Sequence, residues 1–350
     1  MGSLISVVIP IYHVEAFIER CARSLMVQTM DDVEYIFVDD CSPDGSIDIL
    51  KHVVAEYPQR KVQIIRHEVN RGLPAARNTG LSHATGDYIF HCDSDDYLEH
   101  DALEKMYNKA VETDADIVYS DWYLDSPSLT PPVGGRTRYM RCPAYTTPED
   151  ALRGLLHGTM KYNVWNKLVK RKIYNPNLNP NDSLNDKGDC FDDANEKVKG
   201  RVDPAFPEGH GMGEDMTMIL LFARARKVAY LPVATYHYVR QNENAFTAPR
   251  RGATGGLYDD LRFNADRIIA ALQGQISESD LACFKLNVKY PFLISNRRAD
   301  YDRWNQWYSE ANNYISSHQV SARARFLEKC AAWHFYFPLR FHFYLLQCVQ

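Results

Sequence analysis

The chain has 350 residues and a net charge of −5 at pH 7, with 45% hydrophobic and 24% charged residues. These values are ordinary for a globular protein of one large or two modest domains, and the acidic balance gives no reason to expect a nucleic acid partner. No run of 18 apolar residues predicts a membrane-spanning helix. The 8 cysteines form no CxxC pair, and several lie in apolar runs as reduced thiols do, which favours the cytoplasm.

Short apolar runs alternate with helical patterns over the first part of the chain. The runs are rich in β-branched and aromatic residues, which is typical of strands buried on both faces of a sheet. Strands that alternate with helices imply right-handed crossovers and a mostly parallel sheet. The predicted strands are residues 6–12, 33–40, 62–67 and 87–92, and the predicted helices include residues 46–57 and 74–84.

Two of these strands end in aspartates. Asp39 and Asp40 end the second strand, and the sequence HCDSDD places Asp93, Asp95 and Asp96 at the end of the fourth. Neighbouring carboxylates repel each other unless something positive lies nearby. The second group is therefore either a solvated loop that caps the next helix or part of a divalent-cation site. Ligands of open α/β sheets bind beyond the carboxyl ends of the strands, and five acids at that edge favour a functional site.

Four stretches carry a resemblance to a known family: SVVIPIYHVEAFIERCARSLMVQT, VDDCSPDGS, NRGLPAARNTGLSHATGDYIFHCDSDD and GED. They resemble family 2 glycosyltransferases of the GT-A fold, which move a sugar from a nucleotide-sugar to an acceptor. The resemblance covers residues 4–125 densely and continues thinly through residues 163–174 and 213–215. It implies an α/β fold of the GT-A type, with a Rossmann-like, mostly parallel sheet flanked by helices.

The resemblance also implies that residues at the ends of the first three strands hold the donor. In the family, the segment after the first strand edges the nucleotide base, and an acid after the second hydrogen-bonds the base. The NxGxxxARN region lies near the base and the phosphates. The matching residues are, in that order, Pro10, Tyr12 and Glu15, then Asp40 with Asp39 beside it, then Arg71 and Arg77.

The DSD sequence matches the family's DXD motif, which implies a metal site. By that match Asp93 lies by the ribose, Ser94 adjoins the donor, and Asp95 binds the metal that bridges the diphosphate, with Asp93 as a second carboxylate. Mg²⁺ and Mn²⁺ prefer oxygen ligands and are held by one or two carboxylates plus substrate phosphates. His237 lies where some related enzymes have a further metal ligand, although lone histidines are more often hydrogen-bonded core or surface residues.

The acceptor side is matched by two short elements. The ED pair, Glu214 and Asp215, matches the family's catalytic pair, in which the aspartate is the general base. The alternative is that both are ordinary first-turn acids of the helix MTMILLFARA, favoured by its dipole. Trp165 and Lys167 belong to a WNK element that precedes the acceptor site in the family. Trp165 could instead fill the core, and Lys167 could be a surface lysine.

The rest of the chain predicts a catalytic domain over residues 1–250, with a nucleotide-sugar half to about 125 and an acceptor half beyond it. Residues 251–350 predict a helical C-terminal extension. Between them, residues 175–212 are polar and lack periodicity, as in a long functional or disordered loop. The aromatic segment 331–347 predicts either a packed helix or an interfacial membrane element with basic residues nearby.

We therefore expect an inverting glycosyltransferase that depends on Mg²⁺ or Mn²⁺, with a UDP-sugar donor and a saccharide or lipid-linked saccharide acceptor. Hexosyl or N-acetylhexosaminyl transfer in bacterial surface polysaccharide synthesis is the expected setting, in the cytoplasm or at the inner face of the membrane. A sugar nucleotidyltransferase would need a glycine-rich phosphate loop after the first strand, which PIYHVEAF lacks. A non-catalytic nucleotide-sugar-binding protein would lack the base or the metal acids, and both are present.

Overall fold

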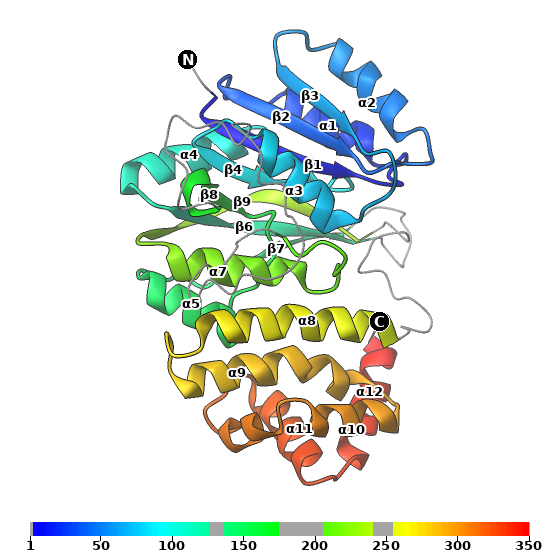
Figure 1. The fold of residues 1–350 in the computed structure, drawn as a ribbon, viewed down its shortest axis with the longest axis vertical. Helices are drawn as coiled ribbons and strands as arrows, with labels where there is room; N and C mark the ends of the chain where they lie inside the picture. The colour runs from blue at the N-terminus through cyan, green and yellow to red at the C-terminus, as the bar shows by residue number, and fades with distance from the viewer. Residues whose placement is uncertain (1–2, 127–135, 175–205, 241–254, 350) are drawn as a thin grey trace, which may run out of the picture.

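The computed structural model describes residues 3–126, 136–174, 206–240 and 255–349 (Figure 1). Within them, nine strands form one sheet in the order β3-β2-β1-β4-β8-β6-β9-β5, with β7 paired to β6. Each of the four predicted strands is present, with both ends within one residue of the prediction. The strands are β1 (Ile5–Ile11), β2 (Val33–Asp39), β3 (Lys61–Arg66), β4 (Tyr88–His91), β5 (Tyr97–Leu98), β6 (Ile117–Ser126), β7 (Arg136–Met140), β8 (Lys167–Lys170) and β9 (Val228–Val239).

The first half of the sheet is parallel and the second half is mixed. β1 lies between β2 and β4 in parallel register, and β3 extends the parallel set beside β2. β8 runs antiparallel to both of its neighbours, β4 and β6, and β5 runs antiparallel to β9. The predicted α/β architecture with flanking helices is confirmed, and the antiparallel pairs lie beyond β4, where the regular alternation of strand and helix ends.

Helices cover both faces of the sheet because strand side chains alternate between the faces. Val8 and Ile36 point into a core with α3, α5 and α7, whereas Val7 and Phe37 point into a second core with α1, α2 and α4. The helices of this part are α1 (Ile18–Met26), α2 (Ser46–Ala55), α3 (Leu73–His83), α4 (Ala102–Thr113), α5 (Pro148–Leu156), α6 (Arg171–Tyr174), the 3-10 turn η1 (Glu214–Met216) and α7 (Thr217–Arg224).

The C-terminal part is helical, as predicted, and shares one of these cores. Leu221 of α7, Ala265 of α8 and Phe284 of α9 belong to the same apolar cluster as Val8 of β1. No helix in the described part of the chain is both long and apolar enough to cross a membrane. The elements are α8 (Gly255–Leu272), α9 (Glu278–Lys289), η2 (Tyr290–Ile294), α10 (Arg298–Gln306), η3 (Ser309–Tyr314), α11 (Ala322–Ala332) and α12 (Phe337–Val349).

Two predictions concern residues that the structure does not describe. The predicted boundary at residue 250 lies in the segment 241–254, outside the described residues. Most of the predicted loop 175–212 lies outside them as well, and the description resumes at residue 206.

A glycine lets α3 lie close against the sheet. A Cβ atom added to Gly80 would lie 2.3 Å from Cγ1 of Val8 on β1, closer than atoms can approach. α3 also carries Arg77, one turn before Gly80, and the helix begins with Pro74 in its first turn, as predicted. The close approach therefore sets the distance between Arg77 and the end of the sheet.

We expect Gly80→Ala to lower the free energy of unfolding by about 1–3 kcal/mol, the usual cost of overpacking a core. Val8 is buried in β1 and cannot move aside, so α3 has to shift outward. Urea denaturation measures the change. The matched control is Gly256→Ala on α8, where an added Cβ meets no atom within 4 Å. An equal midpoint for both variants would show that α3 does not depend on this contact.

Candidate active site

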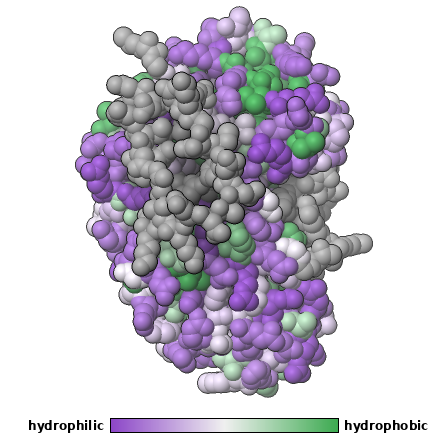
Figure 2. Space-filling model, in the orientation of Figure 1, coloured by the Kyte–Doolittle hydropathy of each residue, from purple (hydrophilic) through white to green (hydrophobic). Residues whose placement is uncertain are grey.

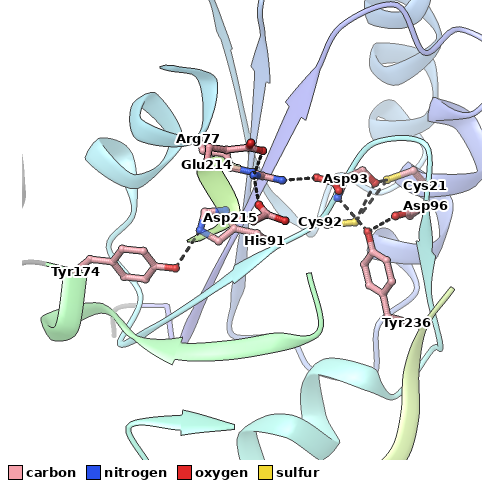
Figure 3. Close-up of polar contacts among 10 residues, drawn as sticks. All are labelled: Cys21, Arg77, His91, Cys92, Asp93, Asp96, Tyr174, Glu214, Asp215 and Tyr236. Carbon is pink, nitrogen blue, oxygen red and sulfur yellow. Dashed lines mark hydrogen bonds and ion pairs between the residues drawn. The ribbon is translucent and has the colours of Figure 1, made fainter. Parts of the chain in front are cut away.

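An arginine and three carboxylates from separate parts of the chain meet at the carboxyl end of β4 (Figure 3). Nη1 of Arg77 donates to Oδ1 of Asp215 at 2.7 Å and to Oε1 of Glu214 at 3.0 Å. Nη2 of Arg77 donates to Oδ1 of Asp93 at 2.9 Å. We name these four residues the Arg77 cluster. It joins the DSD sequence after β4 to the ED pair of η1, two motifs separated by about 120 residues of chain.

The Arg77 cluster is buried on the arginine side and open on the carboxylate side. Arg77 is 1% exposed and lies over the ring of Phe206, with 5.3 Å from the guanidinium carbon to the ring centroid. The side chains of Asp93 and Asp215 remain 26% and 25% exposed, whereas that of Glu214 is 8% exposed. Of the ED pair, Asp215 is therefore the acid that a bound molecule can reach.

Burial and charge act in opposite directions on these groups. Burial raises the pKa of Glu214 and the charge of Asp215 raises it further, while Arg77 lowers it. Burial also raises the pKa of Asp215, and Arg77 again acts in the opposite direction. Burial would lower the pKa of Arg77, but the three carboxylates outweigh it and the pKa is raised. Arg77 thus stays charged, beside acids that bind a proton more readily than ordinary carboxylates.

A buried tyrosine holds the backbone of the DSD sequence. The hydroxyl of Tyr236 on β9 donates to Oδ2 of Asp96 at 2.7 Å and accepts from the backbone N–H of Asp93 at 3.1 Å. Oδ1 of Asp96 accepts from the N–H of Val239 at 2.7 Å, and burial raises the pKa of Asp96 well above its usual range. Asp96 therefore ties the end of β4 to β9 and is a structural acid.

The acids that fit a divalent cation are Asp93 and Asp95, which are both partly exposed, while Ser94 between them is buried. No group of three metal-ligating side chains occurs in the described part of the chain. A Mg²⁺ or Mn²⁺ that is held by one or two carboxylates and by substrate phosphates needs no such group. The residues present therefore fit a site that the donor would complete.

His237, predicted as a further metal ligand, has both ring nitrogens beside carboxylate oxygens. Its Nε2 lies 2.8 Å from Oε1 of Glu99, and its Nδ1 lies 3.0 Å from Oδ2 of Asp125. The ring also stacks on Tyr97 and Tyr123, with centroid distances of 4.1 and 4.6 Å. Both ring nitrogens are bonded to carboxylates, which makes His237 a hydrogen-bonded residue of the sheet.

Asp40 at the end of β2 holds the loop that precedes α3. Its Oδ1 accepts from the backbone N–H of Arg71 at 2.8 Å, and its Oδ2 accepts from the N–H of Gly72 at 2.7 Å. Nδ1 of His67 lies 2.7 Å from the same Oδ1. Gly72 has a φ of +88°, a conformation that favours glycine. The glycine thus permits the turn whose N–H groups donate to Asp40.

One carboxylate oxygen of Asp39 accepts no hydrogen bond from the described residues, whereas both oxygens of Asp40 accept one. Its Oδ1 accepts from the N–H of Ser42 at 2.7 Å. Its buried Oδ2 forms no hydrogen bond to any described residue and has only an ion pair with Nε of Arg66, at 3.3 Å. Which of the two acids bonds a base stays a prediction.

The segment after β1 borders the same edge. Pro10 is buried within β1, and Tyr12 follows it with 48% of its surface exposed. Oε2 of Glu15 accepts from the backbone N–H of Gly45 at 3.1 Å, which fastens this segment to the loop after β2. The structure thus places this segment beside the end of β2, where Ile11 pairs with Asp39, and beside the loop that follows it. A base-binding role for Pro10, Tyr12 and Glu15 stays a prediction.

The segment that precedes the ED pair is docked on α3. Nδ2 of Asn78 donates to the carbonyl of Phe206 at 2.8 Å, and Oδ1 of Asn78 accepts from the N–H of Phe206 at 2.9 Å. Arg71 forms an ion pair with Glu208 at 2.8 Å. These contacts hold residues 206–216 in place, and they engage Arg71 at the rim of the site.

Trp165 and Lys167 are interior residues, which corrects the prediction that they contact the acceptor. Trp165 is 6% exposed and stacks on the rings of Tyr236 and Tyr238 at 4.6 and 5.4 Å. Burial lowers the pKa of Lys167 to about 8. Its ammonium donates to three protein oxygens, the carbonyls of Lys161 and Asn163 and the side chain of Asn166.

Comparisons with known proteins identify the family of the matched region. Residues 6–173 match the family model for glycosyl transferase family 2. The uncharacterized glycosyltransferase EpsJ of Bacillus subtilis is 30% identical over 252 residues, which are 71% of this chain and 64% of that protein. Residues 6–173 are a glycosyltransferase family 2 domain. Another relative, the poly(ribitol-phosphate) β-glucosyltransferase of Bacillus spizizenii, is 45% identical over 116 residues, 32% of this chain and 18% of that protein. The chain thus matches less than two thirds of the length of either relative.

One solved structure matches the fold of this protein over the whole chain. Residues 1–349 of TarS from S. aureus, in complex with UDP-GlcNAc, superpose with a TM-score of 0.64 at 20% sequence identity. The match covers 100% of this chain and 93% of that one, so it includes the C-terminal helices. The fold is therefore GT-A, with a helical C-terminal part.

Sequence reasoning missed several residues that shape this family 2 site. Tyr236 lies in a segment without a motif of its own, and only the fold brings it to Asp93. Asn78 ends the NxGxxxARN region, but the sequence gives no sign of its contact with Phe206. His67 gave a clearer signal, since it follows β3 at the edge where the carboxyl ends of the strands meet. Its contact with Asp40 could have been anticipated from that position.

We expect Arg77→Gln to lower the free energy of unfolding by about 3–5 kcal/mol at pH 8, because buried charges lose their partner. The loss should be smaller at pH 5. The folded pKa values of Glu214 and Asp215 already lie above the ordinary 4.5 and 3.8, and without Arg77 they rise further. Between the unfolded and folded values the folded state binds more protons, so stability falls as pH rises.

Urea denaturation at both pH values measures this difference. The control is Arg23→Gln, which removes ion pairs with Glu19 and Glu56 that are exposed to solvent. It should change stability little at either pH. A loss for Arg77→Gln that is the same at pH 5 and pH 8 would contradict the charge argument.

Proposed function

We propose that the protein transfers a sugar from a nucleotide-sugar donor to a saccharide or lipid-linked saccharide acceptor, with inversion at the anomeric carbon. The Arg77 cluster carries this proposal, because it joins Asp93 of the DSD sequence and the ED pair in one hydrogen-bonded group. A donor whose diphosphate lies at the DSD acids would have its sugar beside the ED pair. A general base must lie within hydrogen-bond reach of the hydroxyl that attacks.

The donor edge favours a uridine diphosphate sugar. The free Oδ2 of Asp39 can accept a hydrogen bond from an N–H group on the edge of a base. The exposed ring of Tyr12 offers an apolar surface beside it. The complex of the structurally similar TarS with UDP-GlcNAc supports the same donor class. The specific sugar would be a hexose or an N-acetylhexosamine.

In the proposed reaction, Asp215 takes the proton from the acceptor hydroxyl. The oxygen forms a bond to the anomeric carbon while the bond to the donor phosphate breaks, and the nucleoside diphosphate leaves with the electron pair. Asp215 fits the role of base better than Glu214 because its side chain is more exposed, 25% against 8%. Arg77 orients the carboxylate through a 2.7 Å hydrogen bond.

Asp95 and Asp93 would hold a Mg²⁺ or Mn²⁺ together with the donor phosphates. Such an ion would offset the negative charge that develops on the leaving diphosphate. The hydrogen bond from the N–H of Asp93 to Tyr236 keeps the turn that carries both acids in one position. Membership of residues 6–173 in a family whose enzymes generally depend on a divalent metal supports this assignment.

Bacterial surface polysaccharide synthesis is the setting that we propose. The name of one relative, a poly(ribitol-phosphate) β-glucosyltransferase, supports an acceptor that is a wall-type glycopolymer. Donors of this type are made in the cytoplasm, so the protein would act on that side of the membrane.

We expect Asp215→Asn to reduce transfer by about 10²–10⁴, the range for loss of one acid–base group. Donor affinity should stay within a few-fold, because the contacts of the nucleotide and metal do not involve Asp215. An effect on the chemical step without an effect on binding marks an interaction that is needed in the transition state. Single-turnover transfer and donor binding, measured side by side, test this expectation.

The matched control is Glu214→Gln, which keeps the shape of the neighbouring acid. It should reduce transfer less, since Glu214 is more deeply buried and shares Arg77 with Asp215. A larger loss for Glu214→Gln than for Asp215→Asn would exchange the two roles. Full transfer by Asp215→Asn would place the base elsewhere.

We expect Asp95→Ala to weaken the binding of UDP in the presence of Mn²⁺ by about tenfold or more, because such an ion has only one or two protein carboxylates. Without Mn²⁺ the variant and the unaltered protein should bind UDP alike. Titration calorimetry with and without the ion measures both values. Glu112→Ala removes an exposed carboxylate on α4 and should change neither. Mn²⁺-dependent affinity that survives in Asp95→Ala would put the metal at another site.

A further inference from the structure

Helix α12 presents an apolar stripe to solvent. Its inward face, which includes Leu339 and His342, is buried against the rest of the helical part. The exposed residues follow the spacing i, i+3, i+4, i+7 and i+8, which places them on one side of a helix. They are Phe337, Arg340, Phe341, Tyr344 and Leu345. A surface helix normally directs polar residues outward, so this stripe marks an interaction surface.

The stripe continues onto α11 and the turn between the two helices. Phe326, Lys329 and Trp333 are spaced i, i+3 and i+7 on α11, and Trp333 is 75% exposed. Phe335 in the turn is 56% exposed, and α11 packs directly on α12. We name the exposed apolar residues of both helices the aromatic patch. They are Phe326, Trp333, Phe335, Phe337, Phe341, Tyr344 and Leu345.

The charges that α11 and α12 themselves contribute near the aromatic patch are mostly positive, while Asp302 of α10 accepts from the hydroxyl of Tyr336 at its edge, at 3.3 Å. Residues 321–350 contain the cations Arg323, Arg325, Lys329 and Arg340 and one acid, Glu328. Glu328 is fully buried and bonded to Nδ1 of His318 at 2.7 Å, so it does not offset the exposed cations. Aromatic side chains among exposed cations are the composition of helices that lie in the headgroup region of anionic membranes.

We propose that the aromatic patch binds the surface of an anionic lipid bilayer, with α12 lying in the plane of the interface. A second copy of the chain fits less well, because a two-fold contact through this stripe would place Arg340 and Lys329 against the same cations of the partner. Phe, Trp and Tyr at the patch, in place of aliphatic residues, also match the enrichment of aromatics at membrane interfaces.

The position of the patch agrees with this proposal. In Figure 1, α12 lies on the side toward which the arrowheads of β1 and β2 point, the side of the candidate active site. The face of the helical part drawn in Figure 2 is mostly hydrophilic, so apolar residues do not cover that part uniformly. The inference does not rest on the proposed sugar transfer, because any protein with this surface would bind lipid.

Sedimentation with lipid vesicles tests the proposal. We expect the full chain to pellet with vesicles that contain phosphatidylglycerol and to remain largely in solution with phosphatidylcholine alone. The combined variant Trp333→Ser, Phe337→Ser and Phe341→Ser should lower the partitioning at least about tenfold. Arg340→Gln alone should lower it about fivefold, and only with the anionic vesicles.

Two controls distinguish binding through the aromatic patch from nonspecific binding of the protein to lipid. Val69→Ser with Val111→Ser removes apolar residues that are 63% and 59% exposed on the catalytic part, and should leave partitioning unchanged. Brominated lipid should quench the fluorescence of the unaltered chain, and Trp333→Phe should remove most of that quenching. Of the other four tryptophans, Trp165, Trp304 and Trp307 are at most 7% exposed, and Trp122 lies on β6 in the catalytic part.

Three results would overturn the proposal. The first is a full chain that never pellets with anionic vesicles. The second is a patch variant that pellets as well as the unaltered chain. The third is a dimer in analytical ultracentrifugation that the patch variant abolishes, since this would assign the patch to a second copy. Donor binding, measured on the same patch variant, should be unchanged and shows that the fold is intact.

Discussion

The burial of one guanidinium among three carboxylates is the constraint on which the site depends. Arg77 is almost inaccessible to solvent, and its neighbours Asp93, Glu214 and Asp215 come from three parts of the chain. Without the cation, three acids this close would repel each other and take up protons. The ion pairs therefore do more than stabilise: they fix the turn after β4 and the turn before α7 in one mutual position. Phe206 and Asn78 close the arrangement by fastening the preceding segment to the helix that carries Arg77.

The acids at the ends of β2 and β4 differ in burial and in the groups that they bond. Asp40 is bonded to the loop before α3, and Asp96 is bonded to β9, so both serve the backbone. Asp39 is also buried, with Oδ1 bonded to Ser42 and Oδ2 in an ion pair with Arg66, whereas Asp95 is partly exposed. The repulsion within each pair is thus offset by protein donors.

The sequence predicts the parallel strands and the edge where the acids meet, because both follow from local periodicity and from one rule about parallel sheets. The residues whose surroundings the sequence does not predict have partners that are distant in sequence. From the sequence, Trp165 could stack on a sugar, but in the fold it stacks on Tyr236 and Tyr238 of β9. From the sequence, His237 could be a metal ligand, but in the fold its two ring nitrogens contact the carboxylates of Asp125 and Glu99. Their roles depend on which strands become neighbours in the mixed half of the sheet, and no period in the chain encodes that order.

One apolar core links the site to the aromatic patch. Ala76 of α3, Leu221 of α7 and Leu339 of α12 belong to the same cluster, with no solvent-filled boundary between the catalytic and helical parts. A close-packed core transmits position because its side chains cannot rearrange freely. The stripe on α12 and the acids around Arg77 therefore keep a fixed relation. If the stripe lies on a bilayer, the open edge of the sheet is held at a constant height above the lipid. An acceptor anchored in that lipid would then be presented to Asp215 by geometry alone, without a domain movement.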